Sequence, residues 1–254
     1  MHFYDDQLQY VYCRIPKVAN SNWRRTLLML TGKFPNYTRP EQIERHLVHN
    51  MNYMDKYIRR LETILPDDSE WRLRKYLKFM FVREPLERLL SAYRDKLVVN
   101  NWGYKDIDAT IVKKYRPHDY NASVERYHDV TFAEFVRYIL DEHAEGKVVD
   151  RHWLPQSKLC SVCDPQFDFI GHYETLNSDV EFVVSKLKSR IHGQQQRELV
   201  EHITFLADSH SETSDLMKQM YLTIPAQHIQ ALYKLYAVDY ALFGYEHPDV
   251  IGFH

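Results

Sequence analysis

The sequence predicts an α/β fold with a mainly parallel sheet that helices cover on both faces. Strand-like runs alternate with helical patterns along the 254 residues, and this order builds a parallel sheet. The mostly apolar run Tyr76–Val82 is typical of a buried strand. Because no clear domain boundary, internal repeat or low-complexity segment interrupts the chain, we expect one domain over residues 1–254.

Several expected elements carry a local signal of their own. Pro85 suits the first turn of a helix, and Thr131 followed by Glu134 has the spacing of a capping box. Residues 100–129 are polar and turn-rich, so we expect a surface excursion there. The expected strands are 9–15, 76–82 and 167–173. We expect one helix that begins after the first strand and runs through Leu30 and another that runs from Pro85 through Tyr93; the other expected helices are 40–65, 131–140, 177–187 and 225–243.

Composition narrows the class of protein. Hydrophobic residues make up 44% of the chain, which is enough for a substantial core. The formal net charge of −2 provides no global basic field, so we expect no nucleic-acid partner, and a polyanionic partner must be held by local basic clusters. Only 7 glycines occur, which argues against a dinucleotide fold built on a glycine-rich turn.

The cysteines and the apolar stretches carry information about the cellular location of the protein. Three cysteines, Cys13, Cys160 and Cys163, are too few for a disulfide scaffold. For the pair Cys160-x-x-Cys163, a structural disulfide and simple packing are both open, whereas zinc would need a second pair. No stretch approaches the roughly 18 to 20 apolar residues of a membrane helix, and no signal peptide is visible at Met1. The chain is either soluble or the catalytic part of a protein whose anchor lies outside it.

The segment after the first expected strand has the properties of an anion site. It consists of a loop with Lys17, a small hydroxyl residue, Ser21, and then the start of a helix. Backbone N–H groups at a helix N-terminus have no partner within the helix, and the helix dipole favours negative charge there. The Walker pattern of an ATP site is absent, which disfavours a nucleotide kinase.

A second anion site is expected after the strand that ends near Arg83. Arg88 and Ser91 follow in the next expected helix, and a guanidinium with a hydroxyl is a natural clamp for a phosphate monoester. The alternatives are a solvated helix face for Arg88 and a strand-end salt bridge for Arg83. Taken together, the two strand–loop–helix units favour a ligand with two separated anionic groups.

Four segments of the chain form a specific pattern. They are PKVANSNW at Pro16–Trp23, FVREPLERLLSAYRDK at Phe81–Lys96, the stretch from His152 to Leu176, and the stretch from Leu232 to Tyr245. In these segments the chain resembles the Golgi carbohydrate sulfotransferases, in particular the branch of chondroitin/dermatan 4-O-sulfotransferases and HNK-1 sulfotransferase. The resemblance implies a P-loop-like parallel sheet flanked by helices, and the donor 3′-phosphoadenosine 5′-phosphosulfate (PAPS).

The resemblance also implies which residues bind the donor. Arg83 and Ser91 would hold its 3′-phosphate, with Arg88 one helical turn before Ser91. Asn20 departs from the family pattern, which usually has Cys there, but its backbone can still bind phosphate. The residues expected to wrap the 5′-phosphosulfate are Pro16, Lys17, Val18, Ala19, Asn20, Ser21 and Asn22.

Sulfuryl transfer requires a base for the acceptor hydroxyl and a cation for the leaving phosphate. Lys17 suits the second task. His46 resembles the histidine that follows the first phosphate element in related sulfotransferases, and we expect it to be the base; His49 is a possible second contact. His152 is the main rival and Glu174 the next, and either could instead position acceptor hydroxyls. No metal is required.

The expected function is transfer of sulfate from PAPS to a glycan, most specifically to the 4-hydroxyl of N-acetylgalactosamine in chondroitin or dermatan chains. The alternatives are another acceptor, such as terminal glucuronic acid or N-acetylgalactosamine on glycoproteins, and a homologue that binds glycan or nucleotide with little activity. The basic residues Lys105, Lys113, Lys114 and Arg116 either guide an anionic glycan or form a solvated surface. By resemblance, the location is the Golgi lumen, as a type II membrane protein.

Overall fold

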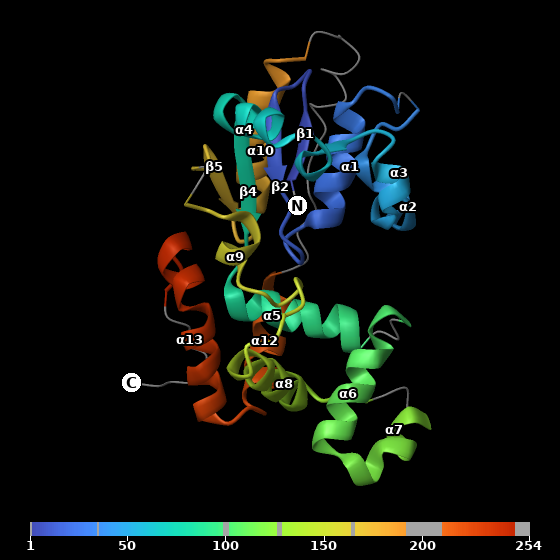
Figure 1. Ribbon diagram of the computed structural model, residues 1–254, viewed down its shortest axis with the longest axis vertical. Helices are drawn as coiled ribbons and strands as arrows, with labels where there is room; N and C mark the ends of the chain where they lie inside the picture. The colour runs from blue at the N-terminus through green and yellow to red at the C-terminus, as the bar shows by residue number, and fades with distance from the viewer. Residues whose placement is uncertain are drawn as a thin grey trace. The chain divides into compact units, whose positions relative to one another are not determined.

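The computed structural model describes residues 2–34, 36–98, 102–125, 129–163, 166–191 and 210–246 (Figure 1). The chain divides into two compact units. The first comprises Met1–Arg83 and Gln156–Asp208, and the second comprises Glu84–Pro155 and Ser209–His254. The expectation of one catalytic domain over the whole chain stays a prediction.

The first unit contains a five-stranded sheet. Its strands are β1 (His2–Asp5), β2 (Tyr10–Cys13), β3 (Arg59–Arg60), β4 (Leu77–Val82) and β5 (Phe169–His172), in the order β3-β1-β2-β4-β5. The neighbours β2, β4 and β5 are parallel, whereas β1 is antiparallel to β2 and β3. The predicted α/β class with a mainly parallel sheet is confirmed, and the three predicted strands are the three parallel ones.

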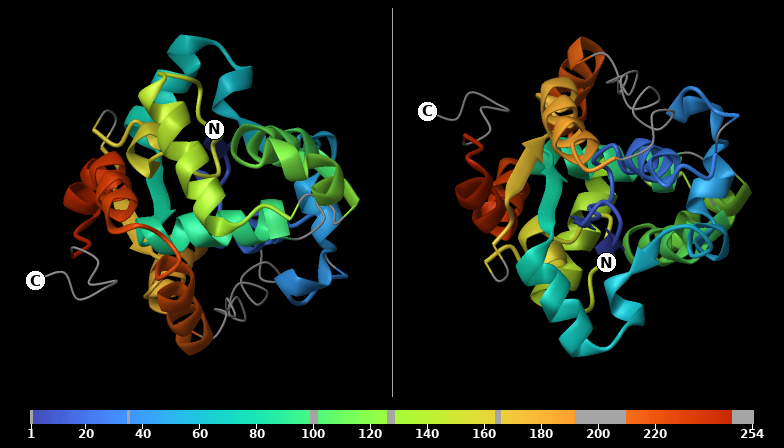
Figure 2. Two further views of the ribbon diagram at one scale, coloured as in Figure 1. Left: turned by 90° about the horizontal axis from the view of Figure 1, so that it is seen from below. Right: turned by 90° about the horizontal axis from the view of Figure 1, so that it is seen from above.

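Helices cover both faces of this sheet. On one face, Trp23 of α1 (Asn20–Leu30) lies 5.1 Å from Phe79 between ring centroids, and Phe182 of α10 (Leu176–Lys188) stacks on Phe169 at 4.8 Å. On the other face, Leu73 of α4 (Pro66–Lys75) packs against a buried cluster that includes Val11. Figure 2 shows α4 and α10 on opposite sides of β4.

The prediction of one helix over 40–65 is wrong. Asn50 has an extended backbone, and its side chain accepts a hydrogen bond from the N–H of Tyr53, so it ends one helix and caps the next. The apolar residues Ile43, Met54 and Ile58 are nevertheless buried. The segment forms η1 (Pro40–Gln42), α2 (Arg45–His49), α3 (Met51–Met54), β3 and η2 (Leu61–Thr63).

The second unit is helical, and its core contains the buried residues Phe135, Trp153 and Tyr236. The surface excursion predicted over 100–129 is wrong, because Ile111 and Val112 of α6 are fully buried. The unit contains α5 (Pro85–Tyr93), η3 (Arg94–Val98), η4 (Trp102–Tyr104), α6 (Lys105–Tyr115), η5 (Pro117–Asp119), α7 (Tyr120–Glu125), α8 (Phe132–Ala144), α12 (His210–Tyr221) and α13 (Ala226–Phe243).

Two predicted helix starts are confirmed. Pro85 lies in the first turn of α5. Thr131 caps α8, since its hydroxyl accepts from the N–H of Glu134 at 3.2 Å while the Glu134 carboxylate accepts from the N–H of Thr131 at 2.8 Å. These reciprocal bonds satisfy two backbone donors that the helix itself leaves open.

Candidate donor-binding site

The loop between β2 and α1 has the geometry of an anion-binding loop. Lys17 and Ala19 adopt left-handed backbone conformations, with φ of 72° and 47°. Residues other than glycine adopt this conformation at a cost of about 1 kcal/mol each, and such strain concentrates at functional sites. Ala19 caps α1 without a side-chain hydrogen bond, and the first turn contains no acidic residue. The first amides of α1 are therefore available for an oxyanion.

The helix behind this loop is firmly anchored in the first unit. Trp23 is fully buried, with ring centroids 5.5 Å from Tyr12 and 4.8 Å from Phe81. Arg24 donates a hydrogen bond to the carbonyl of Val48, which fixes α2 to α1. The loop is therefore held at both ends, by β2 and by a packed helix, and its backbone N–H groups have defined directions.

Of the two histidines on α2, the structure brings His49 to the candidate donor loop, which is the segment Pro16–Asn22 from the end of β2 into the first turn of α1. The Nε2 of His49 lies 2.8 Å from the hydroxyl oxygen of Ser21. The predicted base, His46, is exposed, and its Nδ1 lies 2.9 Å from a carboxylate oxygen of Glu44. The assignment of His46 as base stays a prediction, and His49 has the observed contact with the loop.

Arg83 lies at the edge of the sheet where the donor loop begins. The register pairs Cys13 with Met80 in parallel, so the residues after β2 and after β4 emerge side by side. The guanidinium of Arg83 lies 4.2 Å from the ring centroid of Tyr173. Gln156 accepts a hydrogen bond from the Arg83 N–H at 3.0 Å and donates one to its carbonyl at 2.8 Å. This residue therefore has a fixed backbone and a stacked side chain.

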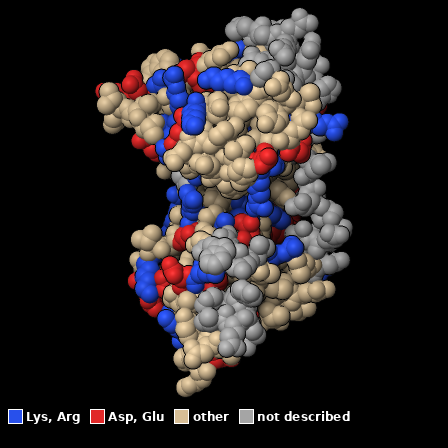
Figure 3. Space-filling model, turned by 90° about the vertical axis from the view of Figure 1, so that its right-hand side faces the viewer, with Lys and Arg blue, Asp and Glu red and all other residues tan. Residues whose placement is uncertain are grey.

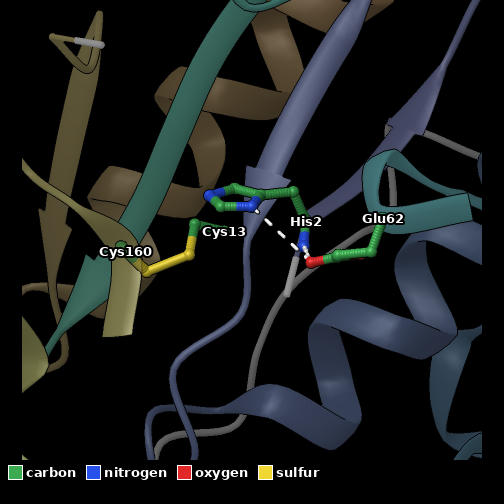
Figure 4. Close-up of a disulfide and its surroundings, with 4 residues drawn as sticks. All are labelled: His2, Cys13, Glu62 and Cys160. Carbon is green, nitrogen blue, oxygen red and sulfur yellow. Dashed lines mark hydrogen bonds and ion pairs between the residues drawn. A yellow bond between two sulfur atoms is a disulfide. The ribbon is translucent and has the colours of Figure 1, made fainter. Parts of the chain in front are cut away.

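A disulfide connects the same two elements. Cys13, the last residue of β2, is bonded to Cys160, the last residue of α9 (Gln156–Cys160), and Figure 4 shows this bond beside His2 and Glu62. A disulfide between Cys160 and Cys163 is therefore wrong, and Cys163 is an exposed free thiol. Because α9 begins with Gln156, the bond connects the strand before the donor loop to the helix that holds Arg83.

The start of α5 differs from the start of α1. The carboxylate of Glu84 caps α5 by accepting a hydrogen bond from the N–H of Glu87 at 2.5 Å, and it also accepts one from the hydroxyl of Tyr240. Burial raises the pKa of Glu84 to about 7. The N-terminus of α5 is therefore already capped by a carboxylate and is not open to an anion. Ser91, the predicted phosphate ligand, is half-buried and lies about two turns further along the helix.

The side chain of Arg88 is not exposed to solvent. It is buried, and its guanidinium donates hydrogen bonds to the carbonyls of Leu154 at 2.8 Å and Arg151 at 2.9 Å. The alternative of a solvated helix face is wrong. These two hydrogen bonds lie within the second unit and give no support to the predicted role of Arg88 as a phosphate ligand.

His152 has two close partners in the second unit. Its Nδ1 lies 2.7 Å from a carboxylate oxygen of Asp150 and 2.7 Å from the hydroxyl oxygen of Tyr104. Burial lowers the pKa of His152, and the carboxylate of Asp150 opposes this effect. The other rival, Glu174, is exposed and follows Tyr173 after the end of β5.

Comparison with known proteins identifies the family. The model described as "Sulfotransferase family" matches residues 1–246. The chain belongs to the sulfotransferase family. This confirms the resemblance found in the sequence, and the five-stranded α/β sheet agrees with it.

The relatives of this sulfotransferase include three carbohydrate sulfotransferases. Carbohydrate sulfotransferase 14 of Danio rerio is 35% identical over 245 residues, covering 96% of this chain and 62% of the relative. Carbohydrate sulfotransferase 11 of Rattus norvegicus is 32% identical, covering 97% and 67%, and carbohydrate sulfotransferase 8 of Homo sapiens is 32% identical, covering 97% and 55%. The chain thus spans about two thirds or less of the length of these relatives. No solved structure matches it.

Sequence reasoning missed three residues that support the predicted site of this sulfotransferase. Gln156 and Tyr173 hold the backbone and side chain of Arg83, and Asp150 holds His152. Gln156 and Tyr173 lie within the family-like segment from His152 to Leu176, and Asp150 lies two residues before it. This position was the sequence signal that pointed to them. Within the described ranges, no group of three metal-ligating side chains gathers, and no helix has the length and apolar character to cross a membrane.

Proposed function

We propose that this protein is a carbohydrate O-sulfotransferase that takes the sulfuryl group from PAPS. The observation that carries the proposal is the open N-terminus of α1 behind a left-handed loop with Lys17, in a chain that matches the sulfotransferase family over residues 1–246. PAPS supplies an activated sulfuryl group and two phosphate-bearing ends. An uncapped helix N-terminus with a neighbouring lysine suits the 5′-phosphosulfate end.

The residues of the chain have distinct roles in this proposal. The loop amides and Lys17 stabilise the negative charge that grows on the leaving phosphate. Arg83, held by Gln156 and Tyr173, binds the 3′-phosphate through a fixed guanidinium, and Ser91 adds a hydroxyl by family resemblance. Arg88 is left out of this set because both of its terminal guanidinium nitrogens already donate to backbone carbonyls, those of Leu154 and Arg151.

For the acceptor, we propose the 4-hydroxyl of N-acetylgalactosamine in a chondroitin or dermatan chain. The family resemblance supports this choice. The basic run of α6 adds no support, because Lys114 pairs with Asp141 at 3.0 Å and Arg116 pairs with Asp129 at 3.0 Å. Figure 3 likewise shows Lys and Arg side chains among Asp and Glu side chains on the face it presents. Another glycan acceptor is the second candidate.

We place this reaction in the Golgi lumen. The disulfide between Cys13 and Cys160 supports an oxidising compartment, since the reducing cytosol disfavours such bonds.

The test is an assay with radiolabelled PAPS and a panel of desulfated glycosaminoglycans and terminal-sugar acceptors, followed by disaccharide analysis of the labelled product. We expect label on the 4-position of N-acetylgalactosamine, and none with Lys17→Ala. Adenosine 3′,5′-bisphosphate, the desulfated product of the donor, should raise the melting temperature of the wild-type protein. Binding of this nucleotide without transfer to any acceptor would indicate the binding homologue instead.

A further inference from the structure

The hydroxyl of Ser21 has one observed partner, the ring of His49. Ser21 lies in the first turn of α1, and the Nε2 of His49, on α2, lies 2.8 Å from its oxygen. Among the residues that the structure describes, no other forms a hydrogen bond with this hydroxyl. Both residues belong to the first unit, which also contains the whole candidate donor loop.

The segment that carries His49 is fixed to α1 by two consecutive arginines. The buried guanidinium of Arg24 donates to the carbonyl of Val48, the residue before His49. The Nε of Arg25 donates to the carbonyl of Ile43, which precedes α2, at 2.7 Å. The backbone that leads to this histidine is therefore held against the same helix whose first turn the ring contacts.

The protons of a hydroxyl and an imidazole allow two arrangements of this pair. A hydroxyl has one proton and two lone pairs, and each nitrogen of a neutral imidazole is either a donor or an acceptor. If Ser21 donates to Nε2 of His49, its oxygen presents only lone pairs, which repel an oxyanion. If Nε2–H donates to Ser21, the hydroxyl proton is left for an oxyanion. An anion on the loop therefore selects the second arrangement.

The surroundings of Ser21 favour an anion. The first turn of α1 contains no acidic residue, and Ala19 caps the helix without a side-chain hydrogen bond. Lys17, in a left-handed backbone conformation, lies four residues before Ser21. Because Ser21 is half-buried and His49 is exposed, the pair is accessible to a ligand.

We propose that His49 is a positioning residue for the sulfuryl donor, which donates from Nε2 to Ser21 and so directs the Ser21 hydroxyl to an oxyanion of the 5′-phosphosulfate. This inference rests on the proposed function. A hydrogen bond that a hydroxyl receives strengthens the one that it donates, and a group oriented in advance loses less freedom on binding. His49 acts through Ser21 and takes no part in moving the proton of the acceptor.

This role differs from the one expected of His46 on the same short helix. The Nδ1 of His46 lies 2.9 Å from a carboxylate oxygen of Glu44, and both side chains are largely exposed. The observed pairing of His46 is thus with its own segment, whereas that of His49 is with α1. A base affects turnover, and a positioning residue of the donor loop affects donor affinity, so the two roles can be measured separately.

The first experiment is a double-mutant cycle on the affinity for adenosine 3′,5′-bisphosphate, measured by calorimetry. A hydrogen bond to a charged group corresponds to about tenfold in affinity, so we expect Ser21→Ala to weaken binding about tenfold and His49→Ala about three- to tenfold. Because His49 acts through Ser21, the double variant should bind no more weakly than Ser21→Ala alone. Additive losses, or a His49→Ala variant that binds as well as wild type, would overturn the inference.

The second experiment separates a hydrogen-bond donor from a merely structural histidine. His49→Gln replaces the ring by an amide that still donates an N–H, so it should regain most of the affinity that His49→Ala loses, whereas His49→Leu should not. Heteronuclear NMR of the wild-type complex should find the hydrogen of the His49 ring on Nε2. Equal affinities of the Gln and Leu variants, or an Nε2 without hydrogen in the complex, would contradict the proposed role.

The third experiment measures transfer from labelled PAPS. His49→Ala should raise the KM for PAPS about three- to tenfold and change kcat by less than about twofold, and the control His143→Ala, an exposed histidine of α8, should match wild type. If the wild-type protein binds the nucleotide and transfers sulfate but His49→Ala matches it, only this inference fails. If the wild type neither binds nor transfers, the proposed function fails as well.

Discussion

Replacement of Glu84 by Gln should change how stability depends on pH. The carboxyl of Glu84 has a pKa of about 7 in the folded protein, against the ordinary value of 4.5, and burial is the main cause. A group whose pKa is raised by folding stabilises the protein below its unfolded pKa, and this contribution is lost as pH rises through the folded pKa. Wild-type protein should therefore lose stability between about pH 4.5 and pH 7 through this group.

The size of the effect follows from the two pKa values. A gap of about 2.5 pH units at 1.36 kcal/mol per unit corresponds to about 3 kcal/mol. Because Glu84 keeps some solvent exposure, we expect about 2 to 3 kcal/mol. Gln stays neutral at every pH and retains an oxygen for the N–H of Glu87. Any constant difference in capping strength leaves the pH dependence unchanged.

The assay is urea unfolding of wild type, Glu84→Gln and the control Glu246→Gln at pH 5, 6, 7 and 8. Relative to wild type, Glu84→Gln should gain about 2 to 3 kcal/mol in unfolding free energy between pH 5 and pH 8. Glu246, an exposed residue after α13, should show no such gain. Parallel curves for wild type and Glu84→Gln would refute the reasoning, since they would mean that the carboxyl at this position titrates as in the unfolded chain.

Three further outcomes are expected. Lys17→Ala should abolish transfer while the melting temperature stays near that of wild type, and near-normal turnover would remove its proposed role at the leaving phosphate. Cys13→Ser should lower the unfolding free energy by about 2 to 4 kcal/mol, because the bond closes a long loop, whereas Cys163→Ser should have little effect; equal losses would contradict the pairing. Tyr173→Leu should weaken binding of adenosine 3′,5′-bisphosphate several-fold by calorimetry through loss of the stacked Arg83, and unchanged binding would exclude this contact as a contributor.

The sequence predicted those parts of the fold that depend on interactions between residues close together in the chain. Pro85 and the pair Thr131 and Glu134 marked helix starts because first-turn geometry and capping involve neighbours in sequence. The three parallel strands were found because each is a short apolar run. The loop between β2 and α1 was singled out for a similar reason, since a strand, a lysine and an uncapped helix lie within a few residues of one another, and its role in donor binding stays a prediction.

The missed features depend on contacts between distant residues. Arg88 occupies a helical position that the sequence cannot distinguish from an exposed one, and the carbonyls of Arg151 and Leu154, more than 60 residues away in the chain, accept hydrogen bonds from its buried guanidinium. The short spacing of Cys160 and Cys163 suggested a local bond, whereas the fold brings in Cys13 from 147 residues away. Asn50 broke the predicted helix over 40–65 by capping a new one, although the apolar spacing continued across it.

The cross-link at the end of β2 has a practical consequence for making this protein. Three thiols allow three pairings, and only the pairing of Cys13 with Cys160 seats α9 where Gln156 reaches Arg83. Protein produced in a reducing bacterial cytoplasm, or oxidised onto Cys163, would lack the covalent link between β2 and α9 beside Arg83. Preparations should therefore be judged by free-thiol titration before an inactive sample is taken as evidence about the enzyme.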